Sequence, residues 1–321
     1  MGLAFYYWLS ADPPVLHHQA LGDRDFGEHL PTTRMYRLVK FTCRTTADAV
    51  LADYARAKKV RPEHRIHYLL DEAHVADEAR ARGAPAHFIH QNAFLDERIY
   101  DVQPEEPKRY DALYNAWFNP VKRHALAAGV PSLVLIGGSS GFLGPGDRDA
   151  YLKGVRAALG RAHFVNLDSN RFLGDREVAQ WINRARVGLC LSASEGGMYV
   201  ATEYLLCGVP VVSTASEGGR DHWFDPGCAR IVAAAPEAVA AGVRDLISLS
   251  PSPTEIRRGA LQKCWSHRRR LIDLVQSFFD EERAGRDYAR EFYARFTTKL
   301  GHWRPPEEAV RHFATDAPPG A

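Results

Sequence analysis

The segment that decides the fold runs from residue 191 to residue 212 and reads LSASEGGMYVATEYLLCGVPVV. Its first residue, Leu191, ends an apolar run that predicts a buried strand, and the Ser- and Gly-rich stretch that follows predicts a turn. A helix is expected to open near Gly197, and a further strand is expected over residues 209–213. This order is typical of a parallel βαβ unit, which binds ligands at the carboxyl ends of its strands.

Two carboxylates accompany this turn and helix. Glu195 lies in the turn, and Glu203 lies eight residues later, about 12 Å further along a helix that rises about 1.5 Å per residue. Carboxylates separated in this way cannot share one small metal ion, but they can bind two ends of an elongated ligand that carries hydroxyl groups. The free amides at the helix start would bind phosphate between them, and the glycines would let the ligand approach. A second interpretation makes Glu203 a surface residue of an amphipathic helix.

Strands and helices alternate on both sides of this segment, which predicts an open parallel sheet in each half of the chain. We expect strands over residues 36–43, 66–70, 86–90, 110–115, 132–136, 163–166 and 187–191. We expect helices over residues 46–59, 72–82, 121–128, 148–159, 175–185, 236–249, 271–279 and 287–300. Residues 11–33 are expected to form a loop, and the charged, Pro-rich residues 101–108 a linker.

The composition narrows the function classes. The chain has 321 residues, of which 45% are hydrophobic and 25% charged, enough for two domains with their own cores. A formal net charge of +2 argues against a large surface for nucleic acid. Five scattered cysteines without metal-ligand spacing indicate a reduced, cytosolic chain. No apolar run approaches the ~20 residues that span a bilayer, and no signal peptide is evident.

The pattern Glu195-x7-Glu203, with Gly196 and Gly197 inside it and residues 207–212 after it, resembles the donor-site signature of retaining GT-B glycosyltransferases, especially family GT4. The resemblance spans roughly residues 110–232, including residues 172–174 and 216–219. It implies an α/β protein of the GT-B fold, with two Rossmann-like domains whose parallel sheets face each other across a cleft.

The resemblance also implies a division of the chain into four segments. Residues 1–106 would be an abbreviated acceptor-side domain, and residues 107–284 the domain that binds a nucleotide sugar. Residues 285–304 would be a helix that crosses back to the first domain, and residues 305–321 a fraying tail.

By this resemblance, Glu203 would accept hydrogen bonds from the ribose hydroxyls and Glu195 would orient the transferred sugar. The backbone amides of Gly196, Gly197 and Met198 would bind the transferred sugar or the phosphates. Leu173 would be a further contact of the nucleotide sugar. No metal ion and no cofactor are expected. The Asp pairs at 23–25 and 147–149 match a metal-binding D-x-D pattern, but we interpret them as loop or helix-cap residues.

The family has an Arg-x4-Lys pair that neutralises the leaving diphosphate, and this chain departs from it. Lys122 occupies the lysine position, whereas Trp117 occupies the arginine position. Loss of a guanidinium weakens the stabilisation of a departing phosphate. Arg123 could replace it, the site could be impaired, or the donor could be unusual; alternatively, Lys122 and Arg123 are a solvated helix end.

On the acceptor side, His90 is the candidate catalytic residue, and His74 and Asn92 are candidate acceptor contacts. His90 ends a strand expected in the first domain, and His74 and Asn92 follow such strands, although a lone histidine is more often structural. Residues 268–270 are three arginines that could bind anionic headgroups, but such a run is usually a solvated helix face.

The sequence therefore predicts a glycosyltransferase, cytoplasmic or peripheral to the inner face of a membrane, that moves a sugar from a UDP- or GDP-linked donor to an acceptor hydroxyl. The acceptor would be a glycan, a lipid-linked molecule or a small molecule, as in glycan or polysaccharide biosynthesis. One alternative within the class is an inverting GT-B enzyme, or one with a CMP- or GDP-linked donor, which the departure at Trp117 allows. Another is a catalytically silent GT-B partner that scaffolds an assembly.

Overall fold

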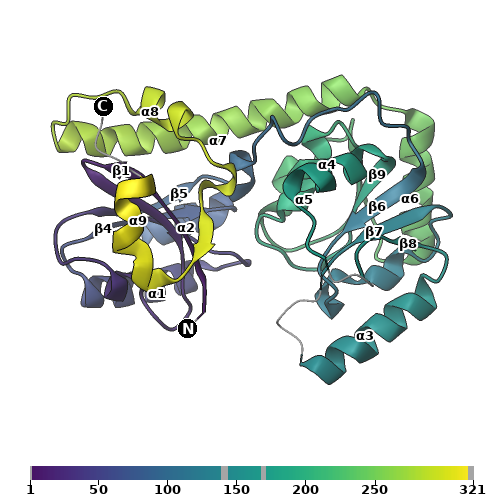
Figure 1. Ribbon diagram of the computed structural model, residues 1–321, viewed down its shortest axis with the longest axis horizontal. Helices are drawn as coiled ribbons and strands as arrows, with labels where there is room; N and C mark the ends of the chain where they lie inside the picture. The colour runs from purple at the N-terminus through teal and green to yellow at the C-terminus, as the bar shows by residue number, and fades with distance from the viewer. Residues whose placement is uncertain (1, 139–143, 168–170, 317–321) are drawn as a thin grey trace. The chain divides into compact units, whose positions relative to one another are not determined.

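The computed structural model describes residues 2–138, 144–167 and 171–316 (Figure 1). The chain divides into two compact units: the first combines residues up to Phe94 with residues from Cys264 onward, and the second comprises Leu95–Lys263. Residues 95–106 thus belong to the second unit and residues 264–284 to the first, which differs from the expected division. The second boundary falls inside one continuous helix, α7 (Pro253–Glu281), where helical periodicity gives no boundary signal.

The first unit contains a six-stranded sheet in the order β12-β1-β2-β3-β4-β5. Strands β2 to β5 are parallel, whereas β1 is antiparallel to both of its neighbours. The strands are β1 (Ala4–Ala11), β2 (Pro14–Gln19), β3 (Tyr36–Lys40), β4 (Arg65–Leu70), β5 (Ala86–Phe88) and β12 (His302–Arg304).

Helices cover both faces of this sheet (Figure 1). Alternate residues of β3 point to opposite faces: Leu38 packs with the C-terminal part of α7 and with α8 (Tyr288–Ala294), and Val39 packs with α1 (Ala47–Val60) and α2 (Ala73–Ala81). Because both faces are buried, the sheet is part of a closed core rather than a surface layer.

Strand β2 lies inside the segment expected to be a loop, so that prediction was wrong. His17 and His18 are buried as fully as Val15 and Leu16. Because polar residues occupy these buried positions, the sequence lacks the apolar pattern of a buried strand. Hydrogen bonds make this burial possible: His17 Nδ1 donates to the Leu300 carbonyl at 2.7 Å, and Arg37 Nε donates to His18 Nε2 at 3.1 Å.

The C-terminal region also differs from the expectation. The helix expected over residues 287–300 ends at Ala294, and the chain returns to the sheet edge as β12. The expected tail contains α9 (Ala309–Asp316), which packs on β1: Trp8 Nε1 donates to the Ala309 carbonyl at 2.8 Å, and the Trp8 and Phe313 rings lie 4.6 Å apart. Residues 317–321 lie outside the described residues.

The second unit contains a six-stranded sheet, all parallel, in the order β11-β10-β9-β6-β7-β8. Its strands are β6 (Tyr110–Asn115), β7 (Leu133–Ile136), β8 (His163–Phe164), β9 (Ala185–Cys190), β10 (Val211–Thr214) and β11 (Ala229–Val232). Its helices include α3 (Pro145–Ala158), α4 (Asp175–Asn183), α5 (Tyr199–Leu206) and α6 (Pro236–Leu249).

This strand order reverses between β6 and β9, the first and fourth strands of the unit, as in doubly wound nucleotide-binding sheets. Close packing of α5 on β9 depends on Gly188, since a Cβ atom there would overlap the Tyr204 ring. The predicted α/β class, with a parallel sheet in each half, is confirmed.

Candidate functional site

The strand order of the second unit reverses between β6 and β9, and the loops that follow these two strands lie next to each other. The loop after β6 and the loop after β9 leave neighbouring strands at the carboxyl edge of the sheet. In an open α/β sheet, crossover connections diverge at such a point and leave a crevice for a ligand. The sequence-predicted donor residues all lie in this unit.

Lys122 and Glu195 meet at this edge. Lys122 Nζ donates to Glu195 Oε1, and Ser192 Oγ donates to the same oxygen. The two side chains of the ion pair are 16% and 14% exposed, so they are largely withdrawn from solvent but still within reach of a ligand. The backbone around Lys122 is held by Tyr114, whose hydroxyl donates to the Lys122 carbonyl at 2.5 Å.

The loop that carries Glu195 is fixed by the loop after β10. Glu195 N donates to the Glu217 carbonyl at 3.0 Å, and Glu217 N donates to the Ala193 carbonyl at 3.0 Å. Gly196 and Gly197 follow Glu195 and are buried, and Met198 is the N-cap of α5 with a left-handed φ of 49°. The helix therefore begins at Tyr199, two residues later than expected.

Glu203 is buried rather than solvated, with 5% exposure, and every residue of α5 from Val200 to Leu206 is buried. The interpretation of Glu203 as a surface residue is therefore wrong. Burial raises the pKa of Tyr100, and the carboxylates of Glu203 and Asp175 raise this pKa further. Tyr100 also donates a hydrogen bond to Asp175 Oδ1 at 3.0 Å, so Glu203 belongs to a buried polar group that includes a phenol.

Arg123 interrupts the helix expected over residues 121–128. Its backbone is left-handed, with φ 49° and ψ 45°, and it separates two 3-10 turns, η3 (Pro120–Lys122) and η4 (His124–Ala127). This turn directs the guanidinium across the strand ends, where Nε donates to the Leu191 carbonyl and Nη2 to Thr214 Oγ1, both at 2.6 Å. The alternative of a solvated helix end for Lys122 and Arg123 is therefore wrong.

Trp117 is half-exposed and follows the end of β6. Its ring lies on the chain after β7, because a Cβ atom at Gly138 would be 2.8 Å from a carbon of the indole. Leu173 is buried just before α4. Asn166 connects these regions, accepting from Gly137 N at 3.1 Å and donating to the Arg171 carbonyl at 3.0 Å.

The acceptor-side candidates of the first unit are arranged differently from the expectation. His90 is fully buried, its Nδ1 accepts from Asn92 N at 3.2 Å, and its backbone amide donates to His267 Nδ1 at 3.2 Å. A ring enclosed in this way cannot touch an acceptor, so its position does not favour the expected catalytic role. Asn92 is also fully buried, whereas the His74 side chain is 75% exposed on α2.

Asp71 follows the carboxyl end of β4 and lies beside His90, and its side chain is more accessible than those of His90 and Asn92. Its side chain is 12% exposed, and it accepts hydrogen bonds from the backbone and side-chain nitrogens of Gln91 at 2.8 and 2.5 Å. The arginine run at 268–270 is partly structural, since Arg268 is 1% exposed and donates to the Ala93 carbonyl at 2.7 Å.

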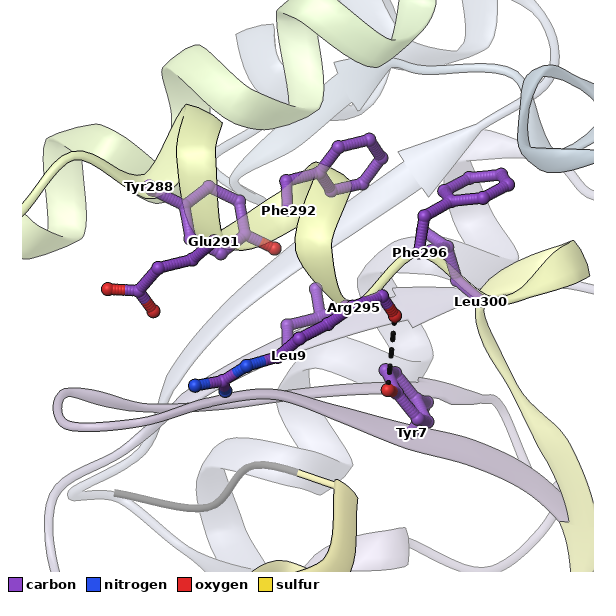
Figure 2. A pocket seen from close by; sticks show the side chains of 8 residues that line it. All are labelled: Tyr7, Leu9, Tyr288, Glu291, Phe292, Arg295, Phe296 and Leu300. Carbon is purple, nitrogen blue, oxygen red and sulfur yellow. Dashed lines mark hydrogen bonds between the residues drawn. The ribbon is translucent and has the colours of Figure 1, made fainter. Parts of the chain in front are cut away.

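The first unit also contains a small pocket between β1 and α8 (Figure 2). Tyr7 closes one side by donating to the Arg295 carbonyl at 3.2 Å, and Phe292 and Phe296 lie on the helix side. Its volume, about 10 Å³, accommodates about one water molecule and no substrate.

Sequence reasoning missed two residues of the second unit that contact this region, Tyr100 and Arg220. Tyr100 precedes the unit's first strand and carried no motif, and Arg220 follows Gly218–Gly219 without a recognised role. Within the ranges that the structure covers, no group of three or more His, Cys, Asp or Glu is placed to hold a metal ion. The same described residues include no helix long and apolar enough to cross a membrane.

Residues 102–248 match the family model described as Glycosyl transferases group 1. The matched residues, which lie within the second unit, are therefore a group 1 glycosyltransferase domain, in agreement with the resemblance noted from the two glutamates. No curated protein matches the chain.

Solved structures extend the comparison to both units. Anabaena Alr3699/HepE in complex with UDP has a TM-score of 0.57 and 14% identity, over 76% of this chain and 79% of that one. Sucrose-phosphate synthase from Thermosynechococcus elongatus has a TM-score of 0.55 and 17% identity, over 77% of this chain and 69% of that one. At these identities the likeness shows the fold, so the predicted GT-B fold is confirmed.

Proposed function

We propose that the protein is a glycosyltransferase of GT4 type that moves a sugar from a nucleotide-sugar donor to an acceptor hydroxyl with retention and without a metal ion. One observation carries this proposal. The Lys122–Glu195 pair lies where the strand order of a group 1 glycosyltransferase domain reverses, with buried Glu203 on the following helix.

The chemistry is electrostatic. The ammonium of Lys122 stabilises the charge that the departing diphosphate accumulates, while Glu195 orients the hydroxyls of the transferred sugar. Glu203 accepts hydrogen bonds from the ribose, and the amides of residues 196–198 bind the sugar or the phosphates. The acceptor attacks from the face that the diphosphate leaves, so no protein nucleophile is required.

In this proposal the guanidinium of Arg123 supplies the positive charge that is missing because Trp117 stands at the family's arginine position. Its guanidinium is held by Leu191 and Thr214 through Nε and Nη2, and its Nη1 makes no hydrogen bond to any residue that the structure describes. A planar cation fixed at one side can bind a phosphate oxygen at the other with little further loss of side-chain entropy. The departure at position 117 therefore does not remove all guanidinium charge from the site.

The proposed donor is UDP- or GDP-linked. The HepE structures were solved with UDP, with UDP and glucose and with UDP-glucose, which supports a uridine diphosphate sugar first. On the acceptor side we propose Asp71 as a contact in place of His90. The acceptor is a glycan, a lipid-linked molecule or a small molecule of glycan biosynthesis, met in the cytoplasm or at a membrane surface.

A second candidate function is a catalytically silent GT-B partner that binds nucleotide or sugar within an assembly. The half-exposed Trp117 at the family's arginine position favours it. Such a partner would bind a nucleotide without hydrolysing or transferring the donor sugar.

A thermal-shift panel of UDP, GDP, ADP, dTDP and CMP tests the proposal. At a ligand concentration about 100-fold above Kd, the cognate nucleotide should raise the melting temperature by roughly 5 °C. Glu203→Gln, which keeps the side-chain volume, and Glu203→Ala should lose most of this shift. Glu237→Ala, on the exposed side of α6, is the matched control and should keep it.

Donor hydrolysis, followed by release of the free nucleotide, separates the two candidates. The wild-type protein should hydrolyse the cognate nucleotide sugar slowly, and Glu203→Gln should not. Binding without any hydrolysis or transfer would favour the silent partner. No shift with any of the five nucleotides would overturn the proposed donor site.

A further inference from the structure

Arg220 is a fully buried cation close to the candidate donor site. It lies in the 3-10 turn η5 (Gly219–Trp223) after β10 and has 0% exposure. Its Nη1 donates to the carbonyls of Cys190 and Ser192 at 3.3 and 3.2 Å, and its Nη2 to the Thr214 carbonyl at 2.6 Å. One guanidinium thus joins the carboxyl ends of β9 and β10.

These contacts act on the loop that carries Glu195. The carbonyl of Ser192 accepts from Arg220, and the hydroxyl of the same residue donates to Glu195 Oε1. The sulfur of Met198, at the other end of the loop, lies 4.0 Å from Arg220 Nη1. Arg220 therefore holds both ends of the loop that forms the site.

The charge of Arg220 is incompletely neutralised. Its Nε donates to Asp221 Oδ1 at 3.1 Å, but the Asp221 side chain is 30% exposed and therefore partly screened by solvent. The other partners named above are neutral carbonyls and a sulfur. A buried guanidinium with such partners projects positive potential toward the strand edge.

A second guanidinium converges on the same residue. Arg123 Nη2 donates to Thr214 Oγ1, while Arg220 Nη2 donates to the Thr214 carbonyl. The pKa of Arg123 is lowered, mainly by burial and further by the charge of Arg220. Two cations at the ends of neighbouring strands repel each other, and an anion bound beside them would reduce this repulsion.

Resting on the proposed function, we propose that Arg220 is a positioning residue that gives the donor site its preference for the diphosphate of the nucleotide. Arg220 holds residues 192–198 through the Ser192 carbonyl and the Met198 sulfur, and it supplies a fixed positive charge. It does not touch the ligand. Its charge adds to that of Arg123, which contacts the same residue, Thr214.

The test compares a nucleoside diphosphate with its uncharged nucleoside. Kd is measured by calorimetry for UDP and uridine, and for GDP and guanosine, on the wild-type protein, Arg220→Met, Arg220→Lys and Arg230→Met. Arg230 is the matched control, because it also donates to backbone carbonyls of this unit, those of Pro226 and Ala229, but from β11. Thermal unfolding confirms that each variant is folded.

Arg220→Met should weaken binding of the cognate diphosphate about tenfold more than binding of its nucleoside, since only the diphosphate interacts with the lost charge. Arg220→Lys should recover part of this difference, and Arg230→Met should show none of it. An equal loss for diphosphate and nucleoside, or no loss, would overturn the role of Arg220 while leaving the donor site intact. Absence of nucleotide binding in the wild-type protein would instead overturn the proposed function and this inference with it.

Discussion

At the scale of a single residue, Lys122 shows what sequence and structure each contribute to a proposed role. It is one of eight lysines in the sequence, and its spacing from Trp117 indicated a phosphate ligand only through a family resemblance. The structure adds that the ammonium lies against Glu195, in the loop that follows the neighbouring strand β9. A partly buried cation beside a carboxylate is held in one position before a ligand arrives, which reduces the reorganisation that binding costs.

Replacing Lys122 with methionine should lower turnover of the cognate donor by about 100-fold or more, since it removes a charge that stabilises the leaving group. Steady-state rates of sugar transfer, or of donor hydrolysis if the acceptor is unknown, provide the measurement. Lys153→Met, on the exposed face of α3, is the control and should retain wild-type turnover. Turnover within threefold of wild type in Lys122→Met would contradict the assignment.

Strand β2 shows how polar residues can form the interior of an element. His17 is fully buried in a strand that pairs with β1 and β3, and burial, with a smaller effect of Lys40, lowers its pKa from 6.5 to about 3. The unfolded chain therefore binds a proton at this histidine below about pH 6.5, whereas the folded chain does not until about pH 3. The stabilising effect of neutral His17 is complete above pH 6.5 and is lost progressively as the pH falls toward 3.

The dependence of the free energy of unfolding on pH tests this strand. Between pH 6 and pH 4, His17→Asn should reduce the slope by about 1.4 kcal/mol per pH unit, because one titrating group is removed. Asparagine retains an N–H donor for the Leu300 carbonyl. His74→Asn, at an exposed position, should leave the slope unchanged. Urea titrations at several pH values give the slopes, and equal slopes in the two variants would refute the burial of His17.

At the scale of the whole molecule, the two units have separate hydrophobic cores. The first unit contains a buried ion pair in which Arg37 donates to both oxygens of Asp25 at 2.9 Å, with side-chain exposures of 0% and 2%. Burial alone would raise the pKa of Asp25, but the hydrogen bonds and charge of Arg37 lower it overall. The pair therefore stabilises the unit above the usual carboxyl pKa and is lost as the pH falls below it.

Asp25→Asn should lower the stability of the first unit by about 3–5 kcal/mol, because it leaves a buried guanidinium unpaired. Hydrogen exchange should increase in residues 2–94 and 264–316, while residues 95–263 keep their protection and the nucleotide Kd stays within about twofold. Asp48→Asn removes an exposed partner of Arg82 and should change stability by less than about 1 kcal/mol. Equal loss of protection in both units would contradict separate stabilisation.

The sequence by itself determined the α/β class and most strands of the second unit, and it supplied the two glutamates from which the donor site is proposed, because apolar periodicity and Gly-rich turns are local signals. Only the tertiary structure decided that Glu203 is buried, that His90 is enclosed and that Arg220 lies beneath the Glu195 loop. These facts depend on which strands become neighbours and on which polar groups meet in the core. Such contacts join residues far apart in the chain, and no local pattern records them.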